Sequence, residues 1–245
     1  MTQIQCSLTQ SAPSGYGFQS SDSGTTISGP PGGGSGSKGP EIKSIFGGGP
    51  NGGEGSTPMN ETLYSDITNI SGVAAVEPIL QEVEGYNKTV YPTMMQNGVQ
   101  SQSTQGFNIT VPNYIIEGIP FNASLINNYP ILPTNVTAGR NLQSTNTCDV
   151  FLSVNNSAYF NAGAGDTINI LGTNFTVVGI YSPSGVDNQD LYMPLSEAQA
   201  ITNNTDTITT LNVFGDNTSD VSSVSNAISV AHPDLNVQTA QDRLS

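Results

Sequence analysis

The chain has 245 residues, and 5 Lys and Arg stand against 19 Asp and Glu, which gives a formal net charge of −14. Such a charge argues against a nucleic-acid-binding surface, because it would repel the phosphates. No run of about 18 apolar residues occurs, so nothing in the sequence is expected to span a bilayer. Charged residues make up only 10% of the chain, and Asn, Thr, Ser and Gln supply the other polarity. A neutral polar surface stays hydrated at any pH, which suits a compartment whose acidity the cell does not control.

Residues 1–56 are dominated by Gly, Ser and Pro and are predicted to be flexible, because they bury too little apolar surface to offset the entropy of ordering. A strand over 3–8 is the exception. Lys38 lies in a glycine-rich stretch, but Ser37 precedes it and Gly39 follows it, which does not match a phosphate-binding loop. No nucleotide site is therefore predicted.

A helix is predicted after this segment. Thr57 and Pro58 are residue types favoured at a helix N-cap and first helical position. Apolar residues then recur three and four positions apart until Gly72, where the helix is expected to end. A strand follows over 73–83, and Pro78 inside it indicates an edge or a bulge.

The C-terminal part repeats this strand–helix–strand pattern. A strand is predicted over 208–214, a helix follows and is ended by Pro233, and Leu235 and Val237 belong to a last strand. The apolar stripe of the helix consists of Val221, Val224, Ile228 and Ala231. With the strand over 3–8, these elements predict an α+β fold of the ferredoxin-like split β-α-β type, with the helices on one face of the sheet.

Residues 86–190 are predicted to be mainly β, with helix confined to 157–160. The expected strands are 107–111, 114–119, 150–154 and a hairpin after Gly165. In this hairpin, Ile168 and Ile170 alternate with polar residues and Gly172 and Thr173 form the turn. A short strand over 191–193 and a helix from Ser196 follow.

The triplet Asn-x-Ser/Thr, the acceptor for N-linked glycans, occurs ten times after residue 57. Its asparagines are Asn60, Asn69, Asn87, Asn108, Asn122, Asn135, Asn155, Asn174, Asn203 and Asn217. A chain rich in Asn and Thr also generates such triplets by chance. The sequence therefore leaves two interpretations open, an N-glycosylated ectodomain and a consequence of composition.

Cys6 and Cys148 are the two cysteines of the chain. In an oxidising compartment they would form a disulfide, which would stabilise the fold by about 4–5 kcal/mol through closure of a long loop. The alternative is two unrelated small buried residues.

No catalytic residue, cofactor or metal site is predicted. His232 is the one histidine of the chain, and its position between a helix end and Pro233 favours a structural role there. Asp187, Asn188 and Asp190 offer oxygens to Ca²⁺, but their spacing is not that of an EF-hand, so a polar turn is the preferred interpretation.

Three glutamates, Glu77, Glu82 and Glu84, lie close together on one predicted strand without the partner pattern of an acid–base pair. The G-x-S-x-G pattern of a nucleophile elbow does not occur. The sequence therefore predicts a protein that is not an enzyme.

Several motifs follow one another in a fixed order. The hairpin from Gly165 reads G-x-x-I-x-I and then F-x-V-V-G. The others are G-V-x-x-V-x-P at Gly72, Val73, Val76 and Pro78, G-R-x-L at Gly139, Arg140 and Leu142, V-x-L-S at Val150, Leu152 and Ser153, and closing elements at His232, Pro233, Val237 and Thr239. In this order and spacing, residues 57–245 resemble the extracytoplasmic core domain of MacB-like and FtsX-like ABC transporter permeases.

This resemblance implies a Porter-like α+β subdomain, residues 57–85 plus 191–245, interrupted by a mainly β, Sabre-like subdomain at 86–190. Arg140 is expected to link the two by hydrogen bonds. Hinge motion is expected where the chain crosses between them, near 84–86 and 184–191.

The resemblance also implies a location on the extracellular face of the plasma membrane, and the sequons favour an archaeal cell. The expected partners are the membrane helices of the full-length permease (one before residue 1 and three after Ser245), a separate cytoplasmic ATPase subunit, and a second copy in a homodimer. The expected function is to couple membrane-helix motion to export or to an extracellular partner. The alternatives are a secreted or S-layer-associated binding glycoprotein and a secreted hydrolase.

Overall fold

The computed structural model describes residues 3–8, 58–91, 93–96, 99–102, 106–129, 131–143, 148–183, 189–217 and 220–239. Some of the sequence predictions lie outside these residues. They are the flexibility of 9–56, Thr57 as an N-cap, the stretch around Lys38, and the polar turn at Asp187 and Asn188.

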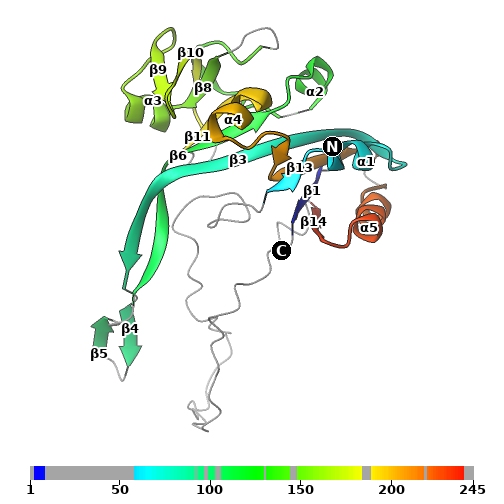
Figure 1. Ribbon diagram of the computed structural model, residues 1–245, viewed down its shortest axis with the longest axis horizontal. Coiled ribbons are helices and arrows are strands. Elements are labelled where there is room, and N and C mark those ends of the chain that lie inside the picture. The colour runs from blue at the N-terminus through cyan, green and yellow to red at the C-terminus, as the bar shows by residue number, and fades with distance from the viewer. Residues whose placement is uncertain are drawn as a thin grey trace, which may run out of the picture.

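Most strands belong to one ten-stranded sheet, in the order β14-β1-β13-β3-β6-β11-β8-β10-β7, with β9 paired to β10 (Figure 1). These strands are β1 (Gln3–Leu8), β3 (Val73–Val90), β6 (Phe107–Ile119), β7 (Val136–Gly139), β8 (Asp149–Ser153), β9 (Thr167–Ile170), β10 (Thr173–Tyr181), β11 (Asp190–Pro194), β13 (Thr210–Gly215) and β14 (Leu235–Thr239). Two short pairs complete the β structure: β2 (Met59–Asn60) with β12 (Thr207–Ile208), and β4 (Thr93–Gln96) with β5 (Val99–Gln102). The helices are α1 (Leu63–Thr68), α2 (Ala123–Asn128), α3 (Val154–Phe160), α4 (Leu195–Thr202) and α5 (Val221–Ala231).

The ferredoxin-like prediction is confirmed at one end of this sheet. Strands β14, β1, β13 and β3 are neighbours and pair antiparallel throughout, as in a split β-α-β fold. Helix α1 connects β1 to β3 in the chain, and α5 connects β13 to β14. Val221, Val224 and Ile228 of α5 are buried, as their spacing predicts.

Beyond β3 the sheet becomes mixed. Strand β6 pairs antiparallel with β3, β11 lies parallel to β6, and β10 lies parallel to β8. The larger hydrophobic core lies on the face covered by α1, α3, α4 and α5 and includes Leu80, Ile116 and Val213. A smaller core lies against α2 and the segment 131–142, and it includes Phe151 and Tyr181.

Strands β3 and β6 extend past the body as a two-stranded ribbon that leads to β4 and β5 (Figure 1). Their register shifts between Glu84 and Gly85, and a Cβ on Gly85 would lie only 2.2 Å from the Val111 carbonyl oxygen. Residues 85–89 are exposed, whereas 76–80 are buried. The bulge is thus the point at which the ribbon leaves the packed body.

The prediction for the start of the first helix is wrong. Helix α1 begins at Leu63, and Met59 and Asn60 form β2 instead. Met59 lies opposite Ile208 of β12 and is buried. A long-range pairing therefore replaces the first helical turn that Pro58 suggested.

Three further predictions needed correction. Helix is not confined to 157–160, because α2 forms over Ala123–Asn128, with the Asn122 side chain accepting a hydrogen bond from the Ser124 N–H as its N-cap. The two strands predicted over 107–111 and 114–119 are one continuous strand, β6. The hairpin turn lies at Leu171 and Gly172, whose φ values are +48° and +88°, one residue earlier than expected.

Candidate functional site

A strip of polar side chains crosses one face of the sheet; we call it the polar strip. Asn212 on β13 lies opposite Glu77 on β3, Gln81 on β3 lies opposite Glu117 on β6, and Glu117 lies opposite Tyr192 on β11. Residues in register on neighbouring strands project from the same face, and so do positions four apart on one strand. The polar strip therefore spans four strands on the face of the smaller core.

Glu77 is the most buried carboxyl of the polar strip, with 2% of its surface exposed. The side-chain amide of Asn212 donates a hydrogen bond of 2.8 Å to Glu77 Oε2. Burial raises the pKa of Glu77 to about 7, against the lowering effect of the Asn212 hydrogen bond. Glu77 thus keeps its proton up to near-neutral pH.

Glu117 is held in a similar way. The Gln81 side-chain amide donates a hydrogen bond of 2.8 Å to Glu117 Oε1. Burial raises the pKa of Glu117, the negative charges of Asp190 and Glu77 raise it further, and the Gln81 hydrogen bond opposes them. Burial and the neighbouring Glu117 also raise the pKa of the Tyr192 hydroxyl.

No lysine or arginine balances these carboxyls within the described residues. The lysines and arginines of those ranges are Lys88, exposed on the ribbon, and Arg140, which pairs with Asp149. The described ranges also contain no group of His, Cys, Asp and Glu that could hold a metal ion. Because burial raises the pKa of Glu77 and of Glu117, these two carboxyls gain and lose protons closer to neutral pH than ordinary glutamates do.

The glutamates that the sequence places close together are divided between the two faces of β3. Glu77 belongs to the polar strip, whereas Glu82 and Glu84, at even positions, lie on the opposite face. Burial and the charge of Glu84 raise the pKa of Glu82, whose Oε2 lies 3.4 Å from the Asn204 side-chain nitrogen. Glu117 was not predicted as a site residue, because it is brought beside Gln81 only by the register of β3 and β6. The one local sign of it in the sequence is a carboxyl side chain inside an otherwise apolar strand.

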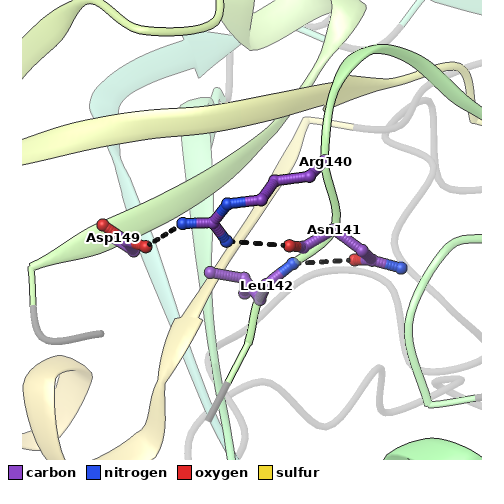
Figure 2. Close-up of polar contacts among 4 residues, drawn as sticks. All are labelled: Arg140, Asn141, Leu142 and Asp149. Atoms are coloured by element: carbon purple, nitrogen blue, oxygen red, sulfur yellow. Dashed lines mark hydrogen bonds and ion pairs between the residues drawn. The ribbon is translucent and has the colours of Figure 1, made fainter. Parts of the chain in front are cut away.

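The G-R-x-L motif has a structural role (Figure 2). Arg140 Nη2 and Asp149 Oδ2 form an ion pair of 3.0 Å, and Arg140 Nη1 donates to the Asn141 carbonyl at 3.1 Å. Gly139 has a φ of +68°, and Leu142 is buried in the smaller core. Arg140 follows β7 and Asp149 begins β8, so the ion pair lies wholly within 86–190. The prediction that Arg140 links the two subdomains is wrong.

His232 is the C-cap of α5, where its backbone N–H donates to the Ile228 carbonyl at 2.8 Å. Cys6 and Cys148 are both free thiols. Cys6 is buried in the larger core, and the Cys148 sulfur lies 3.9 Å from Glu197 Oε2. Cys6 and Cys148 are therefore not joined by a disulfide in this structure.

All ten sequon asparagines are exposed. Among the described residues no helix is both long and apolar enough to cross a membrane.

The match to known families covers most of the chain. Residues 6–231 match the family model described as the MacB-like periplasmic core domain. The chain belongs to this family. The resemblance seen in the motifs is thereby confirmed, and so is the location: this is an extracytoplasmic domain of a MacB-like transporter permease. Membership implies membrane helices in the same permease and an ATPase that works with it.

Two solved structures are similar to this chain, and the first of them shares its fold. The periplasmic region of MacB from Actinobacillus actinomycetemcomitans has a TM-score of 0.51 at 14% identity, over 98% of this chain and 89% of that one. The extracellular domain of the noncanonic ABC-type transporter YknZ from Gram-positive bacteria has a TM-score of 0.48 at 12% identity, over 74% of this chain and 89% of that one. No curated protein sequence matches the chain.

Proposed function

We propose that this MacB-like domain couples the motion of the permease's membrane helices to export or to an extracellular partner, without bond chemistry of its own. The observation that carries the proposal is the register of β1 and β14, in which Ile4 lies opposite Thr239. The start of the first described strand and the end of the last one are therefore neighbours in the sheet. Membrane helices on either side of the chain would act on these two paired strands together.

A continuous hydrogen-bonded path leads from these strands to the far end of the sheet. Strand β1 pairs with β13, β13 with β3, and β3 with β6 (Figure 1). A hydrogen-bonded sheet is stiff within its plane, so a displacement at β1 and β14 would reach β6 and the strands beyond it. In the proposed division, the Porter-like part is 57–85 plus 191–245 and the Sabre-like part is 86–190.

The proposed hinge lies where the chain crosses between these parts. One crossing contains the bulge at Glu84 and Gly85, where the ladder between β3 and β6 is interrupted. The other ends at the start of β11, at Asp190 and Leu191. Across the division, the rings of Tyr129 and Phe214 pack with centroids 4.4 Å apart, so this contact would have to adjust in any relative motion.

The test is a cross-link between positions 129 and 214. It is made in the full permease together with its ATPase, a complex in which two copies of the permease are expected. Cys6→Ala and Cys148→Ser remove the native thiols, and Tyr129→Cys with Phe214→Cys supply new ones for a short bifunctional thiol reagent. Coupling predicts that the linked complex still binds ATP but hydrolyses it several-fold more slowly, because the ectodomain can no longer follow the cycle.

The matched control places the link inside one part. Asn169 and Asn174 are exposed cross-strand partners in the β9–β10 hairpin, and Asn169→Cys with Asn174→Cys should leave ATP hydrolysis unchanged after linking. Undiminished hydrolysis with the link between positions 129 and 214 would contradict coupling and favour a passive binding module.

A further inference from the structure

The exposure of the sequon asparagines is not typical of asparagine in this chain. All ten are exposed, whereas the eleven other asparagines whose burial is described are divided. Exposed without a sequon are Asn127, Asn128, Asn161, Asn169 and Asn226; buried or half-buried are Asn113, Asn141, Asn156, Asn204, Asn212 and Asn236. Triplets produced by composition alone would share the mixed burial of the other asparagines. A glycan cannot be buried, so exposure of every acceptor is what glycosylation requires.

The side-chain hydrogen bonds also differ between five of the sequon asparagines and six of the asparagines without a sequon. Five sequon asparagines, Asn60, Asn87, Asn108, Asn122 and Asn174, accept a hydrogen bond at Oδ1, and their Nδ2 makes none within the described residues. By contrast, Asn128, Asn141, Asn156, Asn169, Asn204 and Asn212, which have no sequon, each donate a hydrogen bond through Nδ2. Nδ2 is the atom that N-linked glycosylation modifies.

Two sequons on the ribbon show the arrangement most clearly. Asn87 lies opposite Thr110, and Thr89 lies opposite Asn108. The Thr89 hydroxyl donates to Asn108 Oδ1 at 2.7 Å, and the Thr110 hydroxyl donates to Asn87 Oδ1 at 3.3 Å. Each sequon therefore uses its hydroxyl to hold the carbonyl of the other, which leaves both amide nitrogens available at the exposed surface.

Two sequons differ. Asn69 Nδ2 donates to the Ser65 carbonyl at 2.7 Å, and Asn217 Nδ2 donates to Asp220 Oδ2 at 3.2 Å. A glycan on either nitrogen would replace a hydrogen and disturb the contact that the nitrogen makes. These two asparagines are thus internal comparisons for the other five.

We propose that the protein carries N-linked glycans on Asn60, Asn87, Asn108, Asn122 and Asn174, and that Asn69 and Asn217 are modified to a lower extent. In this group transfer, the amide nitrogen attacks the anomeric carbon of a glycan carried on a polyprenyl phosphate. The new bond joins Nδ2 to that carbon, the bond from the carbon to the phosphate oxygen breaks, and the lipid phosphate leaves. One proton of the amide passes to a base of the oligosaccharyltransferase, so no oxidant or reductant is required.

The test is glycopeptide mass spectrometry, with a fragmentation method that keeps glycans attached, on the full-length permease purified from the membranes of the cells that produce it. We expect a glycan mass on the five asparagines in most copies, and at least several-fold lower occupancy at Asn69 and Asn217. Asn128, which is exposed but lacks a sequon, is the negative control. Unmodified peptides at all five would overturn the proposal, and equal occupancy at all seven would overturn the role assigned to Nδ2.

A pair of variants tests whether the glycan on Asn87 depends on its triplet. Thr89→Ser keeps both the hydroxyl and the sequon of Asn87, whereas Thr89→Ala removes both. We expect the glycan on Asn87 to persist in T89S and to disappear in T89A, with the sites other than Asn108, whose Oδ1 the Thr89 hydroxyl holds, unchanged. A modified Asn87 in T89A would contradict N-linked attachment through this triplet.

Discussion

Gly118 of β6 lies directly against Ala198 of α4: a Cβ on Gly118 would come within 2.5 Å of the Ala198 Cβ. Helix α4 rests on β6 and β3 at this point, and Ala198 and Leu195 are buried there in the larger core. The closeness of helix and sheet thus depends on the absence of a side chain at Gly118 and on a small one at position 198.

Gly118→Ala should therefore force α4 away from the sheet and lower the free energy of unfolding by about 1–3 kcal/mol, the usual cost of overpacking a core. Urea denaturation of the isolated domain measures this change. Gly163→Ala is the matched control, because the nearest atom to its added Cβ is Asp166 Oδ2 at 3.6 Å. A loss of stability in G163A as large as that in G118A would contradict the packing argument.

Glu77 should make the domain less stable as the pH rises. Its pKa is about 7 in the folded state, against an ordinary value of 4.5. Below pH 4.5 both states hold the proton; between 4.5 and 7 only the folded state does, so stability falls as the pH rises through this window and stays low above it. Glu117 and Glu82, whose pKa values are also raised, act in the same direction.

Glu77→Gln tests this, since an amide of the same shape has no proton to lose. At pH 8 the variant should be more stable than the unmodified protein by on the order of 3 kcal/mol, the equivalent of the pKa shift, and the difference should vanish near pH 4. Thermal unfolding across that range checks it, with Asp66→Asn, at an exposed carboxyl on α1, as control. Equal pH dependence in E77Q and the unmodified protein would refute the assignment.

The sequence predicted those elements whose signals are local. Helix α5 follows from its apolar spacing and Pro233, and the alternation of Ile168 and Ile170 marked the hairpin. Features that depend on pairing with residues far away in the sequence were not predicted. Met59 pairs with Ile208 instead of entering the first helix, and Glu117 joins the polar strip only through the register of β3 and β6.

Within the G-R-x-L motif, the leucine should contribute more stability than the arginine. The Arg140 side chain is 40% exposed, so its ion pair with Asp149 is screened by solvent and Arg140→Ala should cost only about 0.5–1 kcal/mol. Leu142 is 3% exposed in the smaller core, and Leu142→Ala should cost about 2–5 kcal/mol. Urea denaturation of both variants decides the order, and the reverse order would show that the ion pair stabilises the fold more than this burial does.

The contact between Tyr129 and Phe214 should contribute a measurable coupling between the two parts of the proposed hinge. Their rings are tilted by 33° with centroids 4.4 Å apart, a geometry in which aromatic pairs are stabilised by about 0.5–1.5 kcal/mol beyond the area they bury. Tyr129→Leu, Phe214→Leu and the double variant form a cycle in which leucine keeps most of the apolar volume. We expect an interaction energy of about 1 kcal/mol from urea denaturation of the four proteins.

The Tyr129–Phe214 double-mutant cycle has a control, an aromatic pair whose two residues both lie in the Sabre-like part. Tyr159 and Phe160 pack with centroids 5.0 Å apart, and both lie in 86–190. Loss of the contact between Tyr159 and Phe160 should leave ATP hydrolysis by the full transporter unchanged. Loss of the Tyr129–Phe214 contact should alter the hydrolysis rate, because of these two pairs it is the one that lies across the division. An interaction energy near zero for Tyr129 and Phe214 would mean that this contact does not hold the two parts together, and the hinge would then have to be sought in the bulge at Glu84 and Gly85.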